Sequence, residues 1–471
     1  MRALAVSAAG EEHHLSDPQL AELTRRIAAG LHERGIGPGD VVLVRLPKGP
    51  EWLCTMRAIF RLGAVALPCV EQVTDAEVAE RVATTGARLV LLTAGDIPLA
   101  AGPAPAPDCD PAAPGFLIFT SGTEGRPKAA VHPRRYLEAN RLQLERWMGV
   151  RRHDRVWCTA APGWSKSVRN VWFPAELYDC ETVLHAGRFV AVERLELLAR
   201  LQPQVLCMSP TEYRLCAKAP AFGDHDLGGI REAVAAGEAL DAATLTQWRD
   251  AYGITVRDGY GQTECGAVTG VLVGEEPVPG SMGHAMPGVQ LEIVGGELCL
   301  RPETLPTFFS GYLDDAAATA AKLEGGLWHT GDMVDRDAGG RLWYQGRADD
   351  VISSSGYRIG PAEVESALAS HAAVLEAAAV GLPDPDRGEI VHADVVLQPG
   401  RVGTDELRRE LQEHARSVTA PYKYPRSLRF VDHLPRTLTG KVRRGVIRAT
   451  MADPAGRSSD PPESGRNAPL C

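Results

Sequence analysis

The sequence predicts an α/β protein with a large N-terminal domain and a small α+β C-terminal domain. Up to about residue 260, amphipathic helical segments alternate with short apolar strand segments, a pattern typical of mostly parallel sheets covered by helices. Beyond about residue 270, short strands and glycine turns replace this alternation and predict a small β-rich subdomain. The length of 471 residues exceeds what one compact core supports and fits two or three domains.

The first hundred residues illustrate the alternation. A helix is expected after Ser16 and Asp17, because apolar residues recur every three to four positions until Gly35. The remaining expected elements are a strand at 41–46, a helix at 51–62, a strand at 64–67, a helix at 75–85 and a strand at 88–92. The Pro- and Ala-rich stretch 101–114 is expected to be a linker or a surface loop.

The C-terminal third contains different signals. Gly295–Gly296 and Gly339–Gly340 predict hairpin turns. Between 347 and 448 we expect a helix near 363–371, strands at 374–380 and 391–397, and an amphipathic helix at 406–418. The chain is therefore divided into a large domain at 1–346, a small domain at 347–448 and a disordered tail at 449–471, whose composition is rich in Pro, Ser and charge.

Composition excludes several classes of function. A net charge of −10 argues against nucleic acid as a partner, and no apolar stretch is long enough to predict a membrane span. The N-terminus is a poor secretory signal. The 10 cysteines are scattered without metal-ligand spacing, which favours reduced, mostly buried thiols in a cytoplasmic enzyme.

A polar loop follows the apolar strand expected at 115–119. Gly122 and Gly125 let the backbone approach an anion, Thr120, Ser121 and Thr123 offer hydroxyl donors, and Lys128 supplies a positive charge. The spacing differs from that of a Walker loop, which ends in GKS or GKT. These nine residues, TSGTEGRPK, predict a site for phosphate groups.

This loop resembles the phosphate loop of the acyl-adenylate-forming superfamily, which includes acyl-CoA synthetases, luciferases and peptide-synthetase adenylation domains. The resemblance implies that ATP contacts Thr120, Ser121, Gly122, Thr123, Gly125 and Lys128. Glu124 is a departure, because the superfamily usually has Thr or Ser at that position and a carboxylate repels a triphosphate.

Further segments fit the same superfamily in the same order. In Gly259-Tyr260-Gly261-Gln262-Thr263-Glu264, the resemblance implies that Tyr260 stacks on adenine, Thr263 contacts the α-phosphate and Glu264 binds Mg²⁺. Gly237 and Glu238 resemble the segment behind the adenine. Asp332 of Thr330-Gly331-Asp332 resembles the residue that accepts from the ribose hydroxyls, and Arg347 would contact the ribose or phosphate.

The C-terminal motifs imply a mobile small domain. Asp349 resembles the hinge residue, and Gly356, Tyr357 and Arg358 lie where the superfamily receives the pantetheine arm of coenzyme A. Lys441, which ends Thr439-Gly440-Lys441, resembles the catalytic lysine that bridges the acid and the α-phosphate. The implied enzyme alternates between two domain arrangements, one for adenylation and one for thiol transfer.

Several stretches are similar to medium-chain acyl-CoA synthetases, relative to which the N-terminus is expected to be shortened. The resemblance and apolarity make Trp164, Val168, Phe173, Met208 and Gly259 candidates for the acyl pocket. No carboxylate lies between Cys158 and Ala175 to pair with an ammonium group, which disfavours amino-acid substrates. Lys166 and Arg169 could bind a second carboxylate of a diacid, although the superfamily often has a lysine at the position of Lys166.

The expected activity is ATP-dependent activation of a carboxylic acid to acyl-AMP, followed by transfer to coenzyme A, as in fatty acid metabolism. Two alternatives remain. One is an acyl-adenylate ligase that loads an acyl carrier protein, and the other is a degenerate nucleotide-binding homologue without activity. Retention of Lys441, Glu264 and Asp332 argues against the second alternative.

Overall fold

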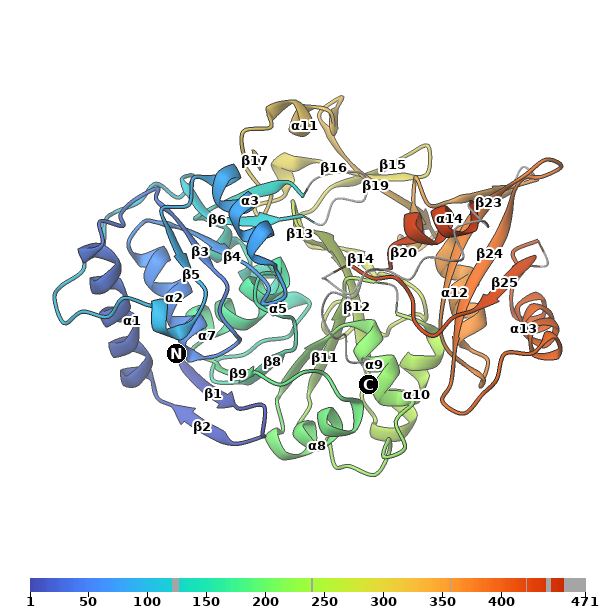
Figure 1. The fold of residues 1–471 in the computed structure, drawn as a ribbon, viewed down its shortest axis with the longest axis horizontal. Helices are drawn as coiled ribbons and strands as arrows, with labels where there is room; N and C mark the ends of the chain where they lie inside the picture. The colour runs from blue at the N-terminus through green and yellow to red at the C-terminus, as the bar shows by residue number, and fades with distance from the viewer. Residues whose placement is uncertain (121–126, 239, 356, 421, 438–441, 453–471) are drawn as a thin grey trace.

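The computed structural model describes residues 1–120, 127–238, 240–355, 357–420, 422–437 and 442–452. The described residues form four sheets and their connecting helices (Figure 1). Two helix-covered sheets form the N-terminal part, at the left and centre of Figure 1. A smaller sheet lies along the top, and a C-terminal sheet with its own helices lies at the right. This arrangement agrees with the predicted α/β fold class.

The N-terminal sheet has six strands in the order β17-β7-β6-β4-β3-β5. Its strands are β3 (Val41–Val44), β4 (Val65–Pro68), β5 (Leu89–Leu91), β6 (Pro114–Phe119), β7 (Ala129–Pro133) and β17 (Gly311–Tyr312). Strands β3 to β6 run parallel, while β7 and β17 are antiparallel additions. The connecting helices are α1 (Asp17–Glu33), α2 (Pro50–Arg61) and α3 (Asp75–Thr85), all close to their predicted positions.

The long sheet has nine strands in the order β14-β13-β12-β11-β10-β8-β9-β1-β2. Its strands are β1 (Arg2–Val6), β2 (Glu12–Leu15), β8 (Arg155–Cys158), β9 (Glu181–His185), β10 (Val205–Met208), β11 (Glu232–Ala236), β12 (Val256–Gln262), β13 (Gly266–Gly270) and β14 (His284–Ala285). No strand was expected in the first fifteen residues, yet β1 pairs in parallel with β9 and in antiparallel with β2.

One large hydrophobic core fills the space between these two sheets. Buried residues of α1 and α2 pack there against one face of β3, β4 and β6 and one face of β8, β10 and β11. The helical stretch from residue 165 to 178 is buried in the same core. It consists of α6 (Ser165–Ser167), a π-helical turn η2 (Val168–Trp172) and α7 (Phe173–Tyr178).

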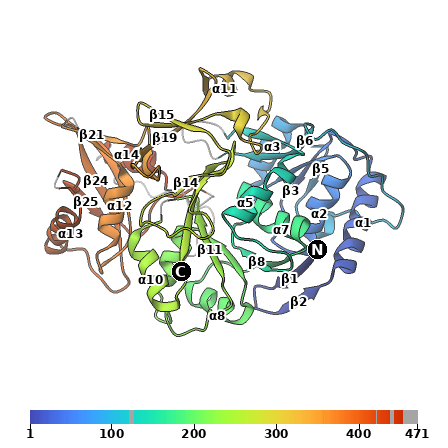
Figure 2. The same cartoon turned by 180° about the vertical axis from the view of Figure 1, so that it is seen from behind.

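The outer faces of both sheets are also covered by helices. Helices α8 (Ala191–Leu201), α9 (Pro210–Ala217) and α10 (Ala242–Tyr252) cover the other face of the long sheet, below it in Figures 1 and 2. Helix α3 packs on the outer face of the N-terminal sheet. The short elements η1 (Ala94–Asp96), α4 (Tyr136–Ala139) and α5 (Arg141–Arg146) lie in the connections. Residues 101–113 contain no helix or strand, as predicted.

The β-rich sheet follows the long sheet in the chain. It comprises β15 (Leu291–Val294), β16 (Glu297–Leu300), β18 (Leu323–Glu324), β19 (Leu327–Arg336) and β20 (Leu342–Arg347), with η3 (Pro302–Thr304) and α11 (Ala316–Ala320) in its connections. Gly295 and Gly296 both have positive φ values, 58° and 88°, as the tight turn between β15 and β16 requires. The antiparallel pairing of β15 with β16 and of β19 with β20 confirms both predicted hairpins.

The C-terminal sheet contains β21 (Ile352–Ser354), β22 (Tyr357–Ile359), β23 (Val374–Asp384), β24 (Gly388–Leu397) and β25 (Ser427–Phe430). This sheet has two hydrophobic cores. Helices α12 (Pro361–Ala369) and α13 (Asp405–Val418) contribute buried residues to one core, and α14 (Arg444–Ala452) contributes to the other. Helix α14 ends at Ala452, so residues 449–452 of the predicted disordered tail are helical. The rest of that tail lies outside the described residues.

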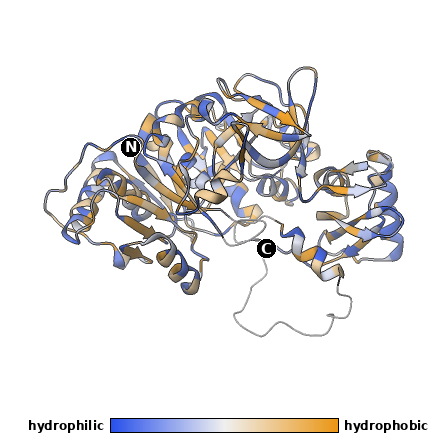
Figure 3. Cartoon of the chain, turned by 90° about the horizontal axis from the view of Figure 1, so that it is seen from above, coloured by the Kyte–Doolittle hydropathy of each residue, from blue (hydrophilic) through white to orange (hydrophobic). Residues whose placement is uncertain are grey.

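Hydropathy follows this layering. Figure 3 shows apolar residues concentrated in the strands and polar residues on the outward helices of the C-terminal sheet.

Every cysteine in the described part of the chain is a free thiol, and all except the half-buried Cys109 are buried. Among the helices that the structure describes, none combines the length and apolar character needed to cross a lipid bilayer.

Candidate active site

Tyr260 and Asp332 are 72 residues apart in the sequence and in contact in the structure. Tyr260 lies on β12 and Asp332 on β19, and the phenol of Tyr260 donates a hydrogen bond to the Asp332 carboxylate. The amide of Gln262 donates a second bond of 2.7 Å to the same carboxylate. Asp332 is only 4% exposed, so hydrogen bonds from the protein stabilise its buried charge.

Arg347 completes this arrangement. Because β19 and β20 form a hairpin in which Asp332 faces Arg347, the guanidinium lies 3.4 Å from the Asp332 carboxylate and donates a 3.0 Å bond to the carbonyl of Thr330. A Cβ atom at Gly331 would lie 2.7 Å from the same guanidinium. Gly331 leaves room for this guanidinium and adopts a φ of 74°, a conformation that favours glycine.

Glu264 contacts a residue that the sequence analysis did not select. The phenol of Tyr312, on β17, donates a 2.6 Å hydrogen bond to the Glu264 carboxylate. Burial and the adjacent carboxylate raise the pKa of Tyr312 far above its usual range, so the phenol keeps its proton. No sequence signal marked Tyr312, because only the pairing of β17 with β7 brings it to this position.

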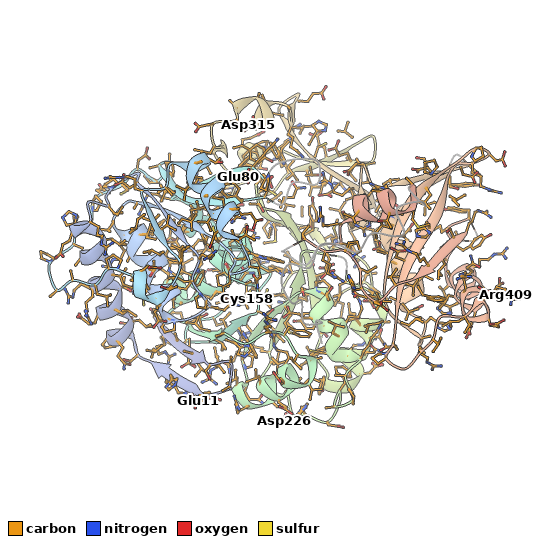
Figure 4. The ribbon with its side chains drawn as sticks, viewed as in Figure 1. Glu11, Glu80, Cys158, Asp226, Asp315 and Arg409 are labelled. Atoms are coloured by element: carbon orange, nitrogen blue, oxygen red, sulfur yellow. The ribbon has the colours of Figure 1, made fainter. Side chains whose placement is uncertain are left out.

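Lys128 lies beside Tyr312. Its ammonium lies 5.2 Å from the centre of the Tyr312 ring and 4.0 Å from the carboxylate of Asp315, which is labelled near the top of Figure 4. Thr120 is the first residue of the phosphate loop, and its amide donates a 2.8 Å bond to the carbonyl of Lys128, the last residue of the loop. The candidates Ser121, Gly122, Thr123 and Gly125 lie outside the described residues, as does Glu124.

The segment expected behind the adenine follows β11. Gly237 has a φ of 112°, and Glu238 is exposed, with its carboxylate accepting a 3.2 Å bond from the amide of Thr211. The ammonium of Lys166 donates a 2.5 Å bond to the carbonyl of Ala236, at the end of β11. Lys166 is therefore engaged with the protein backbone, and the structure offers no support for it as a ligand of a second carboxylate.

The five candidates for the acyl pocket do not gather in one cluster. Val168 and Phe173 are fully buried in the core between the two sheets, whereas Met208 is buried on the opposite face of the long sheet, under α8 and α9. Successive residues of β10 point to opposite faces, so Cys207 shares the core with Val168 and Met208 does not. Met208 therefore packs in a different hydrophobic cluster from Val168 and Phe173.

Trp164 and Gly259 occupy separate positions in this region. Trp164 is half-buried and packs beside the cluster that covers the outer face of the N-terminal sheet. Gly259 lies on β12, where a Cβ atom would lie 2.6 Å from the indole of Trp147. The indole nitrogen of Trp147 donates a 3.2 Å bond to the Asp258 carbonyl, so the ring is held against Gly259.

The family of the chain follows from comparison with known proteins. Residues 1–102 and 93–312 match the AMP-binding enzyme family, and residues 363–441 match the AMP-binding enzyme C-terminal domain. This protein belongs to the AMP-binding enzyme family. The match covers more than half of the chain and includes the Tyr260 and Glu264 segment.

Individual relatives of this AMP-binding enzyme match over nearly its whole length. The chain is 37% identical to the uncharacterized acyl-CoA ligase YtcI of Bacillus subtilis (strain 168), covering 93% of this chain and 91% of the relative. It is 33% identical to the mitochondrial acyl-coenzyme A synthetase ACSM3 of Mus musculus, covering 93% and 84%. Its structure is similar to an anthranilate CoA ligase, AuaEII, with 26% identity and a TM-score of 0.87 over 95% of this chain and 94% of that one.

The hinge candidate lies between the β-rich and C-terminal sheets of this AMP-binding enzyme. The Asp349 carboxylate is 3.5 Å from the Arg347 guanidinium, and its backbone carbonyl accepts a 3.3 Å bond from Arg448 on α14. Arg448 also donates to the Asp350 carboxylate. The segment after the β-rich sheet is therefore held by ionic contacts from both sides.

Of the candidates for binding coenzyme A, only Tyr357 has a described side chain. It is 52% exposed and stacks on Tyr422, with 4.2 Å between ring centres and an interplanar angle of 16°. Gly356, the side chain of Arg358 and the catalytic candidate Lys441 lie outside the described residues. Thr263 is half-buried at the end of β12, next to Glu264.

Proposed function

We propose that this protein is an AMP-forming acyl-CoA synthetase. The observation that carries the proposal is that Tyr260, Gln262 and Arg347 all contact the buried carboxylate of Asp332. Glu264, which is bonded to Tyr312, follows Gln262 closely in the sequence. Relatives named as acyl-CoA ligases or synthetases over most of the chain support the same activity. The substrates are ATP, a carboxylic acid and coenzyme A, and a cytoplasmic location fits the free thiols.

Asp332 has capacity for the ribose of ATP. A carboxylate has about four lone-pair sites, and the two contacts at 3.4 Å, from Arg347 and the phenol of Tyr344, are long. Ribose hydroxyls would replace these long contacts while Gln262 keeps the carboxylate oriented. Arg347 would then be released toward the phosphates, and the Tyr260 ring would lie against the adenine.

Magnesium fits the residues at Glu264. A carboxylate oxygen is a preferred ligand of this hard cation, and Tyr312 engages only Oε1 of Glu264 among its described contacts. When bound, the cation would neutralise charge on the phosphates. Lys128 lies beside Tyr312 and would add a second positive charge at the same end of the nucleotide.

The reaction then proceeds in two transfers. The carboxylate of the acid attacks the α-phosphorus of ATP, and pyrophosphate leaves. The thiolate of coenzyme A next attacks the acyl carbonyl, and AMP leaves. Lys441 and Thr263 would stabilise charge that develops on the oxygens in the first transfer.

We also infer a separate role in the reaction for each of two domains. The large domain, 1–346, binds ATP and the acid. The small domain, 347–448, turns about Asp349 between the two transfers, and Gly356, Tyr357 and Arg358 then approach coenzyme A. The separate hydrophobic cores of the C-terminal sheet support this division, because a body with its own core can move as a unit.

The test measures the two transfers separately. Acid-dependent exchange of pyrophosphate into ATP should occur over a panel of carboxylic acids, and thioester should form when coenzyme A is added. Exchange without thioester, together with loading of an acyl carrier protein, would favour the carrier-protein ligase. Absence of exchange with every acid would favour the degenerate homologue.

Lys441→Ala sharpens this test. Removal of one preorganised charge at a developing oxyanion costs about 100- to 1000-fold in rate, so adenylation should fall by that factor. Thioester formation from supplied acyl-AMP should change little. Normal adenylation by the variant would contradict the role of Lys441, and an equal loss in both steps would contradict the alternation of domains.

A further inference from the structure

Arg169 is the one cationic residue of the π-helical turn η2. Val168, Val171 and Trp172 of this turn are fully buried in the core between the two sheets, whereas Arg169 is only half-buried. A π-helical turn is rare and is frequently found at functional sites. Here the side chain that differs from its neighbours is that of Arg169.

Every contact that the Arg169 guanidinium makes with a described residue is to a neutral group. It lies 3.2 Å from the side-chain oxygen of Gln143, and 3.4 Å from both the carbonyl and the hydroxyl of Ser165. Among the residues that the structure describes, no carboxylate lies within 4.0 Å of it. A desolvated charge without a counter-ion costs free energy, so a partly buried guanidinium gains from an anionic partner.

Arg169 lies beside the strands that carry the proposed nucleotide site. A Cβ atom at Gly266, two residues after Glu264, would lie 3.5 Å from the Arg169 guanidinium. The charge of Arg169 also reaches His132 on β7, because burial, reinforced by Arg169, lowers the pKa of His132 to about 3. His132 is fully buried, and neither ring nitrogen has a hydrogen-bond partner in the described part of the chain.

These contacts separate Arg169 from Lys166, the other cation of the same segment. Lys166 is only 8% exposed, and its ammonium donates a hydrogen bond to a backbone carbonyl at the end of β11. The Arg169 guanidinium retains donors in a planar fork that matches a carboxylate. Among the described residues, the surroundings of Arg169 therefore hold an imidazole without a hydrogen-bond partner, and no carboxylate within 4.0 Å of the guanidinium.

We propose that Arg169 binds a second carboxylate, at the far end of the acid, and that the preferred substrates are dicarboxylic acids activated at one end. This inference rests on the proposed function, since it concerns the same acyl site. The free carboxylate would pair with the guanidinium and supply the missing counter-charge. The other carboxylate would be adenylated as in the general reaction, with pyrophosphate leaving.

The experiment compares acids in pairs of equal carbon number. Straight-chain dicarboxylates of four to ten carbons are each matched with the monocarboxylate, and kcat/KM for pyrophosphate exchange is measured. Hydrogen bonds to charged groups correspond to about 10- to 100-fold, so at least one dicarboxylate should be preferred over its partner by that factor. The half-ester of that dicarboxylate should lose the preference, because its far end is neutral.

Variants of the arginine locate the effect. Arg169→Leu should abolish the preference while leaving the monocarboxylate within a few-fold of the wild-type value. Arg169→Lys should keep part of the preference, because the charge remains without the planar fork. The exposed Arg135, changed to Leu, is the matched control and should leave the preference intact.

Two results would overturn the inference. The first is that no dicarboxylate of any length is preferred over its monocarboxylate. The second is that Arg169→Leu lowers kcat/KM equally for both acids, which would mean that Arg169 contacts the reacting carboxylate or has a structural role. Calorimetric binding of the same pairs with a non-hydrolysable ATP analogue separates this inference from the proposed function. Tighter, Arg169-dependent binding of a dicarboxylate without exchange would support the site while contradicting the synthetase.

Discussion

The ammonium of Lys218 donates a 2.8 Å hydrogen bond to the backbone carbonyl of Val374. It donates another, of 2.7 Å, to the carbonyl of the next residue, Leu375. Lys218 follows α9 of the long sheet, and Val374 begins β23 of the C-terminal sheet. One side chain thus joins two parts of the protein that have separate hydrophobic cores.

Lys218→Met should loosen this contact. The methionine keeps most of the apolar stem and removes both bonds, each of which is worth about 1.5–3 kcal/mol when the donor is charged. We expect limited proteolysis to cut the segment between the β-rich and C-terminal sheets faster than in the wild type. The melting temperature of the part of the protein that contains the long sheet should change little. Lys218→Arg retains donors and serves as the control. Identical proteolysis of Lys218→Met and the wild type would mean that other contacts hold the two parts together.

Tyr312→Phe should alter the metal dependence of adenylation. The substitution leaves the ring and removes the 2.6 Å hydrogen bond that orients the Glu264 carboxylate. Loss of such a bond costs about 1–3 kcal/mol, which predicts a several-fold or greater rise in the Mg²⁺ concentration for half-maximal pyrophosphate exchange. The KM for the acid should stay close to the wild-type value. An unchanged Mg²⁺ dependence would argue against Glu264 as a ligand.

Gly259→Ala should destabilise the protein. The added Cβ atom would lie 2.6 Å from the Trp147 ring, which is 2% exposed and cannot move without repacking the core. Overpacking of this kind costs about 1–3 kcal/mol, measurable in the free energy of unfolding by urea. Gly445→Ala is the matched control, because nothing lies within 4 Å of its added Cβ on α14. Partial rescue of Gly259→Ala by Trp147→Phe would identify the indole as the cause.

Asp258→Asn should change how stability depends on pH. Burial raises the pKa of Asp258 from 3.8 to about 7, so the folded state holds a proton that the unfolded chain releases above about pH 4. Asp258 therefore favours folding less and less as the pH rises from about 4 to 7. Urea unfolding at intervals across this range should show the wild type losing stability relative to Asp258→Asn. A constant difference between the two would indicate that Asp258 is ionised throughout.

Much of the fold was predictable because it depends on local spacing. Apolar residues at helical spacing marked α1 and α3, and paired glycines marked the turns after β15 and β19. Strand β1 was not predicted, since a five-residue strand of small residues carries little signal alone. It becomes a strand because β9 offers a free edge, far away in the sequence.

The motifs determined which residues to consider at the site, and tertiary structure decided which of them meet. Sequence placed Tyr260 and Asp332 in separate motifs, and the meeting of β12 with β19 brings their side chains into contact. The sequence gives no reason to select Tyr312, and it separates Lys166 from Arg169 only by the lysine that the superfamily often has at the position of Lys166. Their hydrogen-bond partners differ because β11 ends beside Lys166, whereas Arg169 lies in the turn that faces β13. Partners of this kind come from distant segments, so local spacing in the sequence cannot specify them.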